Sequence, residues 1–188
     1  MAAVGPVVLA TGGTGGHVFP AEALAGELEA RGVPFTLVTD SRGRQWQGAL
    51  SRRPIHYIRS ASPTGSLKGK AKALLTLAVG LFDAWRVLGR IAPSAVVGFG
   101  GYASVPTMVA ARLRRLPAML HEQNAVLGRA NRLLAARVGF IATAWPAYAA
   151  SLRALEALGG KAVSIDYSPF EEAARLPLEE DDEAEMRS

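Results

Sequence analysis

The stretch Val7-Val-Leu-Ala-Thr-Gly-Gly-Thr-Gly-Gly-His17 decides the fold of this chain. Its first four residues predict a short buried strand, and Phe19, Leu24 and Leu28 then recur at roughly helical spacing. A glycine-rich turn between a strand and a helix brings backbone N–H groups and the positive end of the helix dipole close to an anion, usually a phosphate. The stretch therefore predicts an α/β protein that binds a phosphorylated ligand, with His17 at the mouth of the site.

The turn matches neither of the two common phosphate-binding loops. A Walker loop ends in Gly-Lys-Ser/Thr, but His17 stands where the lysine would be. The dinucleotide fingerprint fails because Val18 occupies its third glycine position, which counts against an epimerase or an NAD-dependent enzyme. Asp40 follows the second expected strand, where an NAD site has an acid, but polar residues commonly end strands. A purely structural turn is the alternative, yet its glycines would lose much conformational entropy on folding.

Composition limits the chain to one domain with at most an appendage. The 188 residues are 49% hydrophobic, which is enough for a core, and they include no cysteine for disulfides or thiolate metal sites. The histidines, His17, His56 and His121, are not spaced as metal ligands. The first residues lack the charged and apolar regions of a signal peptide, so we expect a cytosolic protein.

Charge is distributed unevenly along the chain. Residues 171–188 carry two arginines and eight carboxylates, a net −6, which leaves a net +11 on residues 1–170 of a chain whose total is +5. A basic body indicates an anionic partner such as a phosphate, a nucleic acid or an anionic membrane. Nucleic acid is disfavoured, because aromatic residues make up only 7% of the chain and no RRM, KH or helix-turn-helix signature is present.

Apolar runs and helical segments alternate, which predicts a doubly wound parallel sheet with helices on both faces. The expected strands are residues 7–10, 35–38, 95–98, 118–120 and 140–142, with a shorter one at 55–58. The expected helices are residues 19–31, 70–91, 104–115, 128–137 and 146–158. Ligands bind such sheets at the carboxyl ends of the strands. Three glycine-rich or polar loops follow expected strands, and we expect them to meet at this edge: 12–17, 98–102 and 121–124.

Three motifs resemble, in order and in spacing, the MurG family of N-acetylglucosaminyltransferases of bacterial peptidoglycan synthesis. They are Thr11-Gly-Gly-Thr-Gly-Gly-His-Val-Phe-Pro20, Gly98-Phe-Gly-Gly-Tyr-Ala-Ser-Val-Pro106 and His121-Glu-Gln-Asn-Ala-Val-Leu-Gly128. The resemblance covers about residues 5–144 and implies a Rossmann-like, acceptor-binding domain over residues 1–166, the N-terminal half of a GT-B glycosyltransferase. Residues 167–188 are then expected to form a flexible acidic tail, and the family's C-terminal donor domain is expected to be absent.

The resemblance also implies a reaction. The C4 hydroxyl of the muramyl sugar of lipid I attacks the anomeric carbon of UDP-N-acetylglucosamine with inversion, which gives lipid II. No metal ion or cofactor is implied, since N–H groups and helix dipoles hold the phosphates in this fold class. Without a donor domain, we expect an incomplete transferase, the acceptor subunit of a split transferase, or a non-catalytic binder of a polyprenyl-pyrophosphate-linked sugar.

The resemblance assigns roles to the three loops. The proton of the attacking hydroxyl goes to His17, whose ordinary pKa near 6.5 suits a base, or to Glu122, which would have to be buried in a closed cleft. The first loop is expected to hold a diphosphate, the second to line the pyrophosphate of the acceptor, and the third to contact the UDP-sugar. The expected substrate-binding residues are Gly13, Thr14, Gly15, Gly16, Gly100, Gly101, Tyr102, His121, Gln123 and Asn124.

A basic cluster followed by apolar residues occupies residues 67–91. Such a segment suits docking on an anionic membrane surface, and equally a core helix with a solvated start. Asp83 and Arg86 interrupt its apolar run, which is too short to span a bilayer. Because the implied acceptor is a polyprenyl lipid, we expect a peripheral protein on the cytoplasmic face of the bacterial inner membrane. The expected membrane contacts are Lys68, Lys70, Lys72, Leu75, Phe82 and Trp85.

Overall fold

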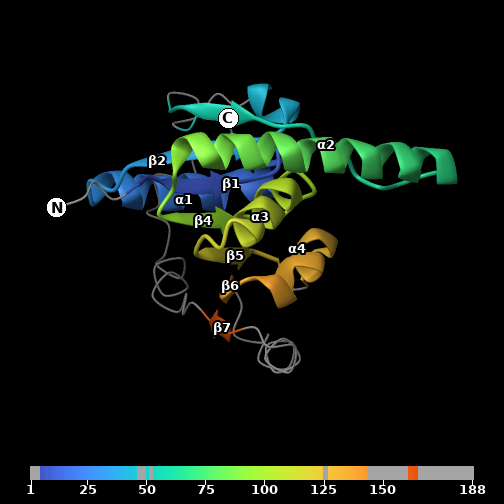
Figure 1. Cartoon of the computed structure of the whole chain (residues 1–188). Helices are drawn as coiled ribbons and strands as arrows, with labels where there is room; N and C mark the ends of the chain where they lie inside the picture. The colour runs from blue at the N-terminus through green and yellow to red at the C-terminus, as the bar shows by residue number, and fades with distance from the viewer. Residues whose placement is uncertain (1–4, 46–49, 51–52, 125–126, 144–160, 165–188) are drawn as a thin grey trace, which may run out of the picture.

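The computed structural model describes residues 5–45, 50, 53–124, 127–143 and 161–164. These residues form a parallel sheet with helices packed on it (Figure 1). The strands are β1 (Val7–Ala10), β2 (Phe35–Thr39), β3 (Ile55–Tyr57), β4 (Ala95–Gly98), β5 (Ala118–Glu122), β6 (Phe140–Thr143) and β7 (Lys161–Ser164). The helices are α1 (Gly15–Ala30), α2 (Leu67–Ile91), α3 (Ser104–Leu113) and α4 (Arg129–Leu134), with 3-10 turns η1 (Ser41–Gln45) and η3 (Ala135–Arg137).

Helices cover both faces of the sheet. Side chains of a strand alternate between the faces, so Val8 and Leu9 enter different cores. Val8 packs with residues of α2 and α3, such as Leu88 and Met108, whereas Leu9 packs with residues of α1, such as Ala25. This arrangement explains why the strands are continuous apolar runs, as expected for parallel strands buried on both faces.

The strand order is β3-β2-β1-β4-β5-β6-β7, and every pair is parallel. The chain therefore first builds the sheet outward from β1 through β2 and β3, and then crosses back to continue from β1 through β4. The carboxyl ends of β1 and β4 meet at this reversal, which is where doubly wound folds bind their ligands. The predicted fold class, a Rossmann-like doubly wound sheet, is confirmed.

Helix α2 is by far the longest element. Its 25 residues span roughly 37 Å at the usual helical rise, and its N-terminal half extends beyond the ends of the strands (Figure 1). Ser66 caps this end by accepting a hydrogen bond from Gly69 N, and Ala92 ends the helix in the left-handed conformation with φ 48°. Within the described part of the chain, no helix has the length and apolarity needed to cross a membrane.

Two predicted boundaries near the site are wrong. Helix α1 begins at Gly15, not at residue 19, because the carbonyl of Thr14 already accepts the N–H groups of His17 and Val18. Strand β5 continues through Glu122 instead of ending at residue 120, since its last two residues pair with Ala142 and Thr143 of β6. The predicted helix at 146–158 and the acidic tail lie outside the described residues, and β7 was not predicted.

Candidate active site

The N-terminus of α1 forms one side of the site. Thr14 is its N-cap residue, with extended backbone angles, but its hydroxyl makes no capping bond. The N–H groups of Gly15 and Gly16 have no acceptor among the residues that the structure describes. Free N–H groups at the positive end of a 16-residue helix attract an anion. The local structure thus matches the phosphate-binding geometry that the glycines suggest.

His17 lies in the first turn of α1 and is held by two threonines. Its Nδ1 lies 2.6 Å from the hydroxyl oxygen of Thr14, and its carbonyl accepts a hydrogen bond of 3.0 Å from the Thr11 hydroxyl. Burial lowers the pKa of His17 below 6.5; the carboxylate of Glu122 opposes this shift and the guanidinium of Arg42 adds to it. The imidazole is therefore neutral at neutral pH and free to accept a proton.

The backbone of the turn after β4 lies close to the ring of His17. Gly100 and Gly101 have φ values of 87° and 72°, a conformation that strongly favours glycine. A Cβ atom on Gly100 would lie 3.1 Å from Cδ2 of His17 and 3.3 Å from Nδ2 of Asn131. The backbone angles therefore favour glycine at this position, and a Cβ atom would also require His17 or Asn131 to shift slightly.

Glu122 organises the loop that closes the other side. Its side chain is buried, and its carboxylate accepts four N–H groups. Oε1 accepts the backbone N–H of Asn124 at 3.0 Å and its side-chain amide at 2.7 Å. Oε2 accepts Gly128 N at 2.8 Å and Nδ2 of Asn131 at 2.9 Å. Such a buried carboxylate, saturated with donors, fixes the backbone around it.

These elements enclose one pocket of about 270 Å³ at the carboxyl edge of the sheet. The loops that follow β1, β4 and β5 all contribute to it, as the sequence predicted. Its walls carry the imidazole of His17, the left-handed backbone of Gly100–Gly101 and the carboxylate of Glu122. The lining residues are His17, Gly100, Gly101, Tyr102, Glu122, Asn124, Gly128, Arg129, Ala130 and Asn131.

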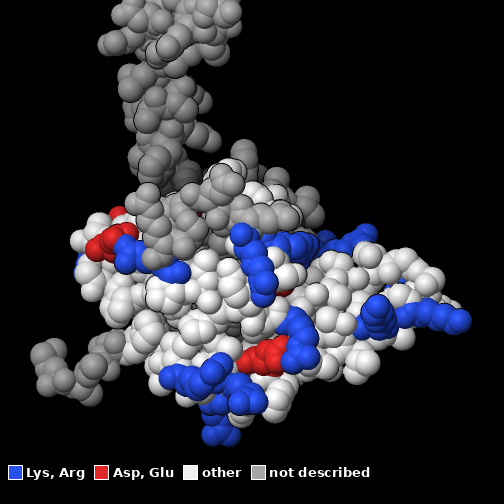
Figure 2. Space-filling view, turned by 90° about the horizontal axis from the view of Figure 1, so that it is seen from above, with Lys and Arg blue, Asp and Glu red and all other residues white. Residues whose placement is uncertain are grey.

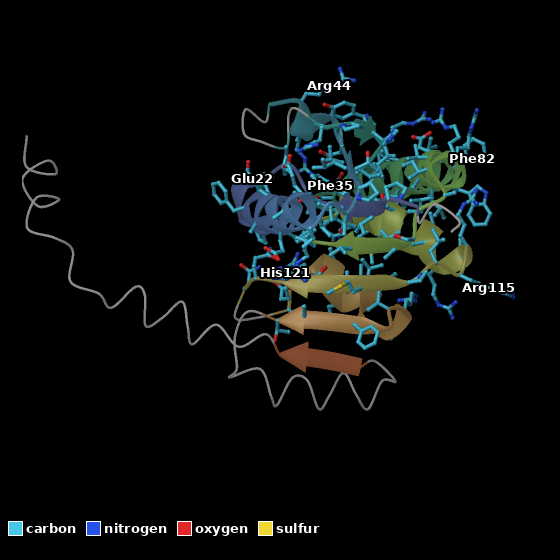
Figure 3. All side chains as sticks on the ribbon, turned by 90° about the vertical axis from the view of Figure 1, so that its left-hand side faces the viewer. Glu22, Phe35, Arg44, Phe82, Arg115 and His121 are labelled. Carbon is cyan, nitrogen blue, oxygen red and sulfur yellow. The ribbon has the colours of Figure 1, made fainter. Side chains whose placement is uncertain are left out.

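His121 lies beside this pocket but does not line it. Its ring packs at 5.6 Å, centroid to centroid, from Phe99, and Figure 3 places it at the ends of the strand arrows, near α1. Burial lowers its pKa, against the opposing effects of a hydrogen bond with Gln123 and the charge of Glu122. In the described residues, no three His, Asp or Glu side chains are grouped so as to hold a metal ion.

Residues 7–143, well over half of the chain, match the family described as "Glycosyltransferase family 28 N-terminal domain". The chain belongs to glycosyltransferase family 28. The match begins with β1 and ends with β6, so it includes every residue that lines the pocket.

Curated family 28 relatives carry one recurrent name, UDP-N-acetylglucosamine–N-acetylmuramyl-(pentapeptide) pyrophosphoryl-undecaprenol N-acetylglucosamine transferase. The relative from Rhodospirillum centenum is 55% identical over 141 residues, which cover 75% of this chain and 37% of that protein. The relative from Bradyrhizobium diazoefficiens is 46% identical over 160 residues, which cover 85% of this chain and 43% of that protein. The chain thus spans about two fifths of the length of these relatives.

Solved structures agree with the family assignment. The crystal structure of MurG from Acinetobacter baumannii superposes with a TM-score of 0.63 at 31% identity, over 77% of this chain and 42% of that one. A glycosyltransferase from Siraitia grosvenorii, solved in complex with UDP, superposes with a TM-score of 0.55 over 87% of this chain and 51% of that one. Its identity of 10% supports the shared fold alone.

Some residues that line this pocket could be predicted from the sequence, and others could not. The predicted residues His17, Gly100, Gly101, Tyr102, Glu122 and Asn124 all line the pocket, whereas the predicted binding residues Gly13–Gly16, His121 and Gln123 do not line it. The prediction missed Arg129 and Asn131, which lie in α4. Helical spacing alone does not show which side of a short helix faces a ligand, so no sequence signal marked them.

The contacts of Asp40 do not indicate that it binds the ribose of a nucleotide. Its buried carboxylate accepts the backbone N–H of Arg42 at 3.1 Å and two guanidinium bonds at 2.9 Å and 2.6 Å. The hydrogen bond and charge of Asp40 raise the pKa of Arg42 against burial. This pair fixes the η1 turn beside the glycines of the first loop.

The predicted membrane-contact residues all lie on α2, on its solvent side. Leu75 is 68% exposed, Phe82 59% and Trp85 38%, and Lys68, Lys70 and Lys72 are exposed. The guanidinium of Arg114 covers the Trp85 ring at 4.2 Å and donates to the Trp85 carbonyl. Figure 2 shows basic side chains gathered at the projecting end of the molecule.

Proposed function

We propose that this chain is the acceptor-binding part of an N-acetylglucosaminyltransferase of peptidoglycan synthesis. The reaction joins N-acetylglucosamine from UDP-N-acetylglucosamine to lipid I, with inversion, and forms lipid II. The observation that carries the proposal is the single pocket in which His17, the Gly100–Gly101 turn and the Glu122-centred loop converge. The names of the relatives, one of them 55% identical over 141 residues, support the choice of substrates.

His17 is the base in this proposal. The attacking C4 oxygen forms a bond to the anomeric carbon, its proton passes to Nε2 of His17, and UDP leaves with the electron pair of the broken bond. This role requires the tautomer in which Nδ1–H donates to the Thr14 hydroxyl oxygen, 2.6 Å away. The same hydrogen bond stabilises the imidazolium once it has formed, so Thr14 is a positioning residue.

Glu122 positions the site and does not take up the proton. Four N–H groups already occupy its oxygens, and its side chain is 1% exposed. A proton on either oxygen would displace a donor and loosen the loop that carries Asn124 and Asn131. The geometry therefore favours His17 among the two candidate bases.

The glycines supply the anion-binding groups. We assign the free N–H groups of Gly15 and Gly16, at the positive end of α1, to the diphosphate of the donor, with Gly13 and Thr14 beside them. Gly100, Gly101 and Tyr102 line the pyrophosphate of the acceptor. Asn124 contacts the donor sugar nucleotide, and His121 of β5 and the adjoining Gln123 support this loop.

Helix α2 brings the pocket to the membrane that holds the lipid acceptor. Its exposed apolar residues insert among headgroups, and its lysines attract anionic lipids at about 1 kcal/mol each. This docking makes the protein peripheral on the cytoplasmic face of the bacterial inner membrane. In this proposal, a second domain completes the donor site.

Binding of the acceptor tests this proposal directly. A lipid I analogue with a short polyprenyl chain is titrated into the protein, next to a control compound that lacks the pyrophosphate. We expect binding of the analogue only, and loss of that binding in Gly101→Val, whose side chain enters the pocket; circular dichroism checks that the variant folds. Equal binding of the two compounds, or none, would contradict the acceptor role and favour a different ligand.

A further inference from the structure

A groove of about 520 Å³ opens at the amino edge of the sheet, between the end of α3 and the starts of β5 and β6. It shares no residue with the pocket at the carboxyl edge. Figure 3 shows Arg115 of this groove beside the tails of the strand arrows, whereas His121 lies beside their heads. The residues that line this arginine groove are Arg112, Arg115, Leu116, Pro117, Ala118, Ala136, Arg137, Val138, Gly139 and Phe140.

The three arginines of the groove have no counter-charge in the described part of the chain. Arg112, Arg115 and Arg137 are exposed, and none of them forms an ion pair with another described residue. Arg137 also donates to the carbonyl of Leu133, which orders its side chain. No carboxylate is among the described residues that line the groove. The groove therefore favours an anionic occupant.

Apolar side chains lie beside these charges. Phe140 is 51% exposed, and Leu116 and Val138 line the same groove. Burial of this surface is favourable only for an occupant that has apolar groups next to its negative charges. An acidic peptide with neighbouring leucines has both features, whereas an inorganic anion has only the charge.

One segment of this chain has that composition. Leu176-Pro-Leu178 is followed directly by Glu179-Glu-Asp-Asp-Glu183, a run of five carboxylates. Residues 176–183, called the acidic segment below, lie outside the described residues. Their sequence therefore places two leucines next to a dense negative charge, which complements the groove.

The sheet topology brings the chain to the groove. Strand β7 is the neighbour of β6, and Lys161 at its start pairs with Phe140 of the groove. From Ser164 at the end of β7, the way back to the level of Phe140 is about 10 Å, at about 3.3 Å per strand residue. Residues 165–175, which connect β7 to the acidic segment, can span more than about 30 Å. The acidic segment is therefore within reach of the groove.

Another group of arginines in the described residues fits this segment less well. Arg44, Arg86 and Arg90 line a pocket next to β3, which is the outermost strand on the far side of the sheet from β7. Six strand spacings, or about 29 Å, separate β3 from β7. That pocket also contains the carboxylate of Asp83, which accepts two hydrogen bonds from Arg59.

We propose that the acidic segment docks in the arginine groove, with its carboxylates on the three arginines and its leucines against Phe140. Exposed ion pairs are individually weak, but the covalent connection to β7 gives the segment an effective concentration on the order of millimolar at the groove. The docked segment covers a basic face of the protein and leaves the pocket at the carboxyl edge open. This contact does not depend on the proposed transfer reaction.

The absence of cysteine from the chain allows a direct test. A nitroxide spin label on Ala184→Cys, next to the acidic run, broadens the NMR signals of nearby amides in the full chain. We expect strong loss of the amide signals of Gly139 and Phe140 in the groove, and unchanged signals of Arg44 and Tyr57 beside β3. In about 1 M salt, where the Debye length is about 3 Å, the groove signals should recover.

Two variants of equal charge show whether the groove itself holds the segment. One removes the three groove arginines, and its matched control removes the three arginines beside β3; all six are exposed. The groove variant is R112Q/R115Q/R137Q, and the control variant is R44Q/R86Q/R90Q. We expect the groove variant to lose the broadening at Gly139 and Phe140 and the control to keep it. Circular dichroism checks that both variants fold.

Several results would overturn the proposal. They are no broadening at the groove, equal broadening over the whole surface, or an equal effect of the two variants. An equimolar mixture of spin-labelled chains with isotope-labelled chains that lack the cysteine tests whether the contact is intramolecular. Broadening of the groove signals in this mixture, as strong as in the singly labelled chain, would assign the contact to a second copy and contradict docking within one chain.

Discussion

The hydroxyl oxygen of Thr14 lies 2.6 Å from Nδ1 of His17, at the N-terminus of helix α1. Thr14 occupies the N-cap position, where a threonine hydroxyl usually caps the helix, but here it bonds the imidazole instead. The first two N–H groups of the helix are thereby left for a ligand. One residue thus orients the proposed base and leaves the proposed anion site open.

Replacing Thr14 by valine should lower the pKa of His17 further. The imidazolium of the unaltered protein donates to the Thr14 hydroxyl, and valine removes that acceptor while burial still disfavours the charge. NMR titration of the His17 ring protons measures the change. Thr14→Ser is the control, which keeps the hydroxyl and should titrate like the unaltered protein; an equal shift in both variants would show that the hydrogen bond has no role.

Acid should destabilise the fold through its histidines. Burial is the first cause that lowers the folded-state pKa of His17, His56 and His121, whereas in the unfolded chain they titrate near 6.5. The unfolded state therefore binds more protons as the pH falls through 6.5, and the free energy of unfolding falls with it. Urea unfolding between about pH 7.5 and about pH 5.5 measures this slope. His121→Phe should flatten it, and a slope that this variant leaves unchanged would exclude His121 as a contributor.

Glu122→Gln should reduce the free energy of unfolding by about 2 to 3 kcal/mol, because an NH₂ group would then face buried N–H donors. The matched control is Glu27→Gln, which alters an exposed ion pair with Arg31 and should cost less than about 0.5 kcal/mol. Urea denaturation of both variants decides the matter. If Glu122→Gln were as mild as the control, the carboxylate would not organise the loop.

Gly100→Ala should cost about 2 to 3 kcal/mol of unfolding free energy, from its left-handed backbone and from contact with His17 and Asn131. Gly32→Ala separates these causes, since Gly32 has φ 66° but no atom within 4 Å of a built Cβ. It should therefore cost only about 1 kcal/mol. Equal costs would mean that the space beside His17 is less restricted than the structure shows.

Leu75→Ser/Phe82→Ser should weaken binding to anionic vesicles, since both side chains are more than half exposed on the proposed docking face of α2. The loss should reach about a hundredfold, given roughly 1.5 to 3 kcal/mol for burial of each of the two large apolar side chains. Co-sedimentation measures it. Leu133→Ser, which removes a 54% exposed leucine from α4, should bind as the unaltered protein does; a comparable loss there would mean that α2 is no special contact surface.

Much of the fold could be predicted from the sequence, because buried parallel strands appear as short apolar runs and the glycine turn marks the first crossover. The turn at Gly100 and Gly101 could also be predicted, since adjacent glycines after a strand indicate left-handed backbone. The end of β5 was not, because His121 and Glu122 look like loop residues when their pairing with β6 is unknown.

The role of Glu122 depended on contacts that sequence spacing does not reveal. A carboxylate after a strand suits a base, an N–H acceptor or a solvated end equally well. Only the fold shows that Asn124, Gly128 and Asn131 all donate to it.

The central claim is that this chain is the acceptor half of an N-acetylglucosaminyltransferase. The most direct measurement is sugar transfer from radiolabelled UDP-N-acetylglucosamine to a lipid I analogue, with and without a separately produced C-terminal domain of MurG. We expect transfer in the mixture, little or none with either part alone, and loss of transfer in His17→Ala. Absence of transfer in the mixture, while the chain still binds the lipid I analogue, would contradict the catalytic role and leave a binding protein.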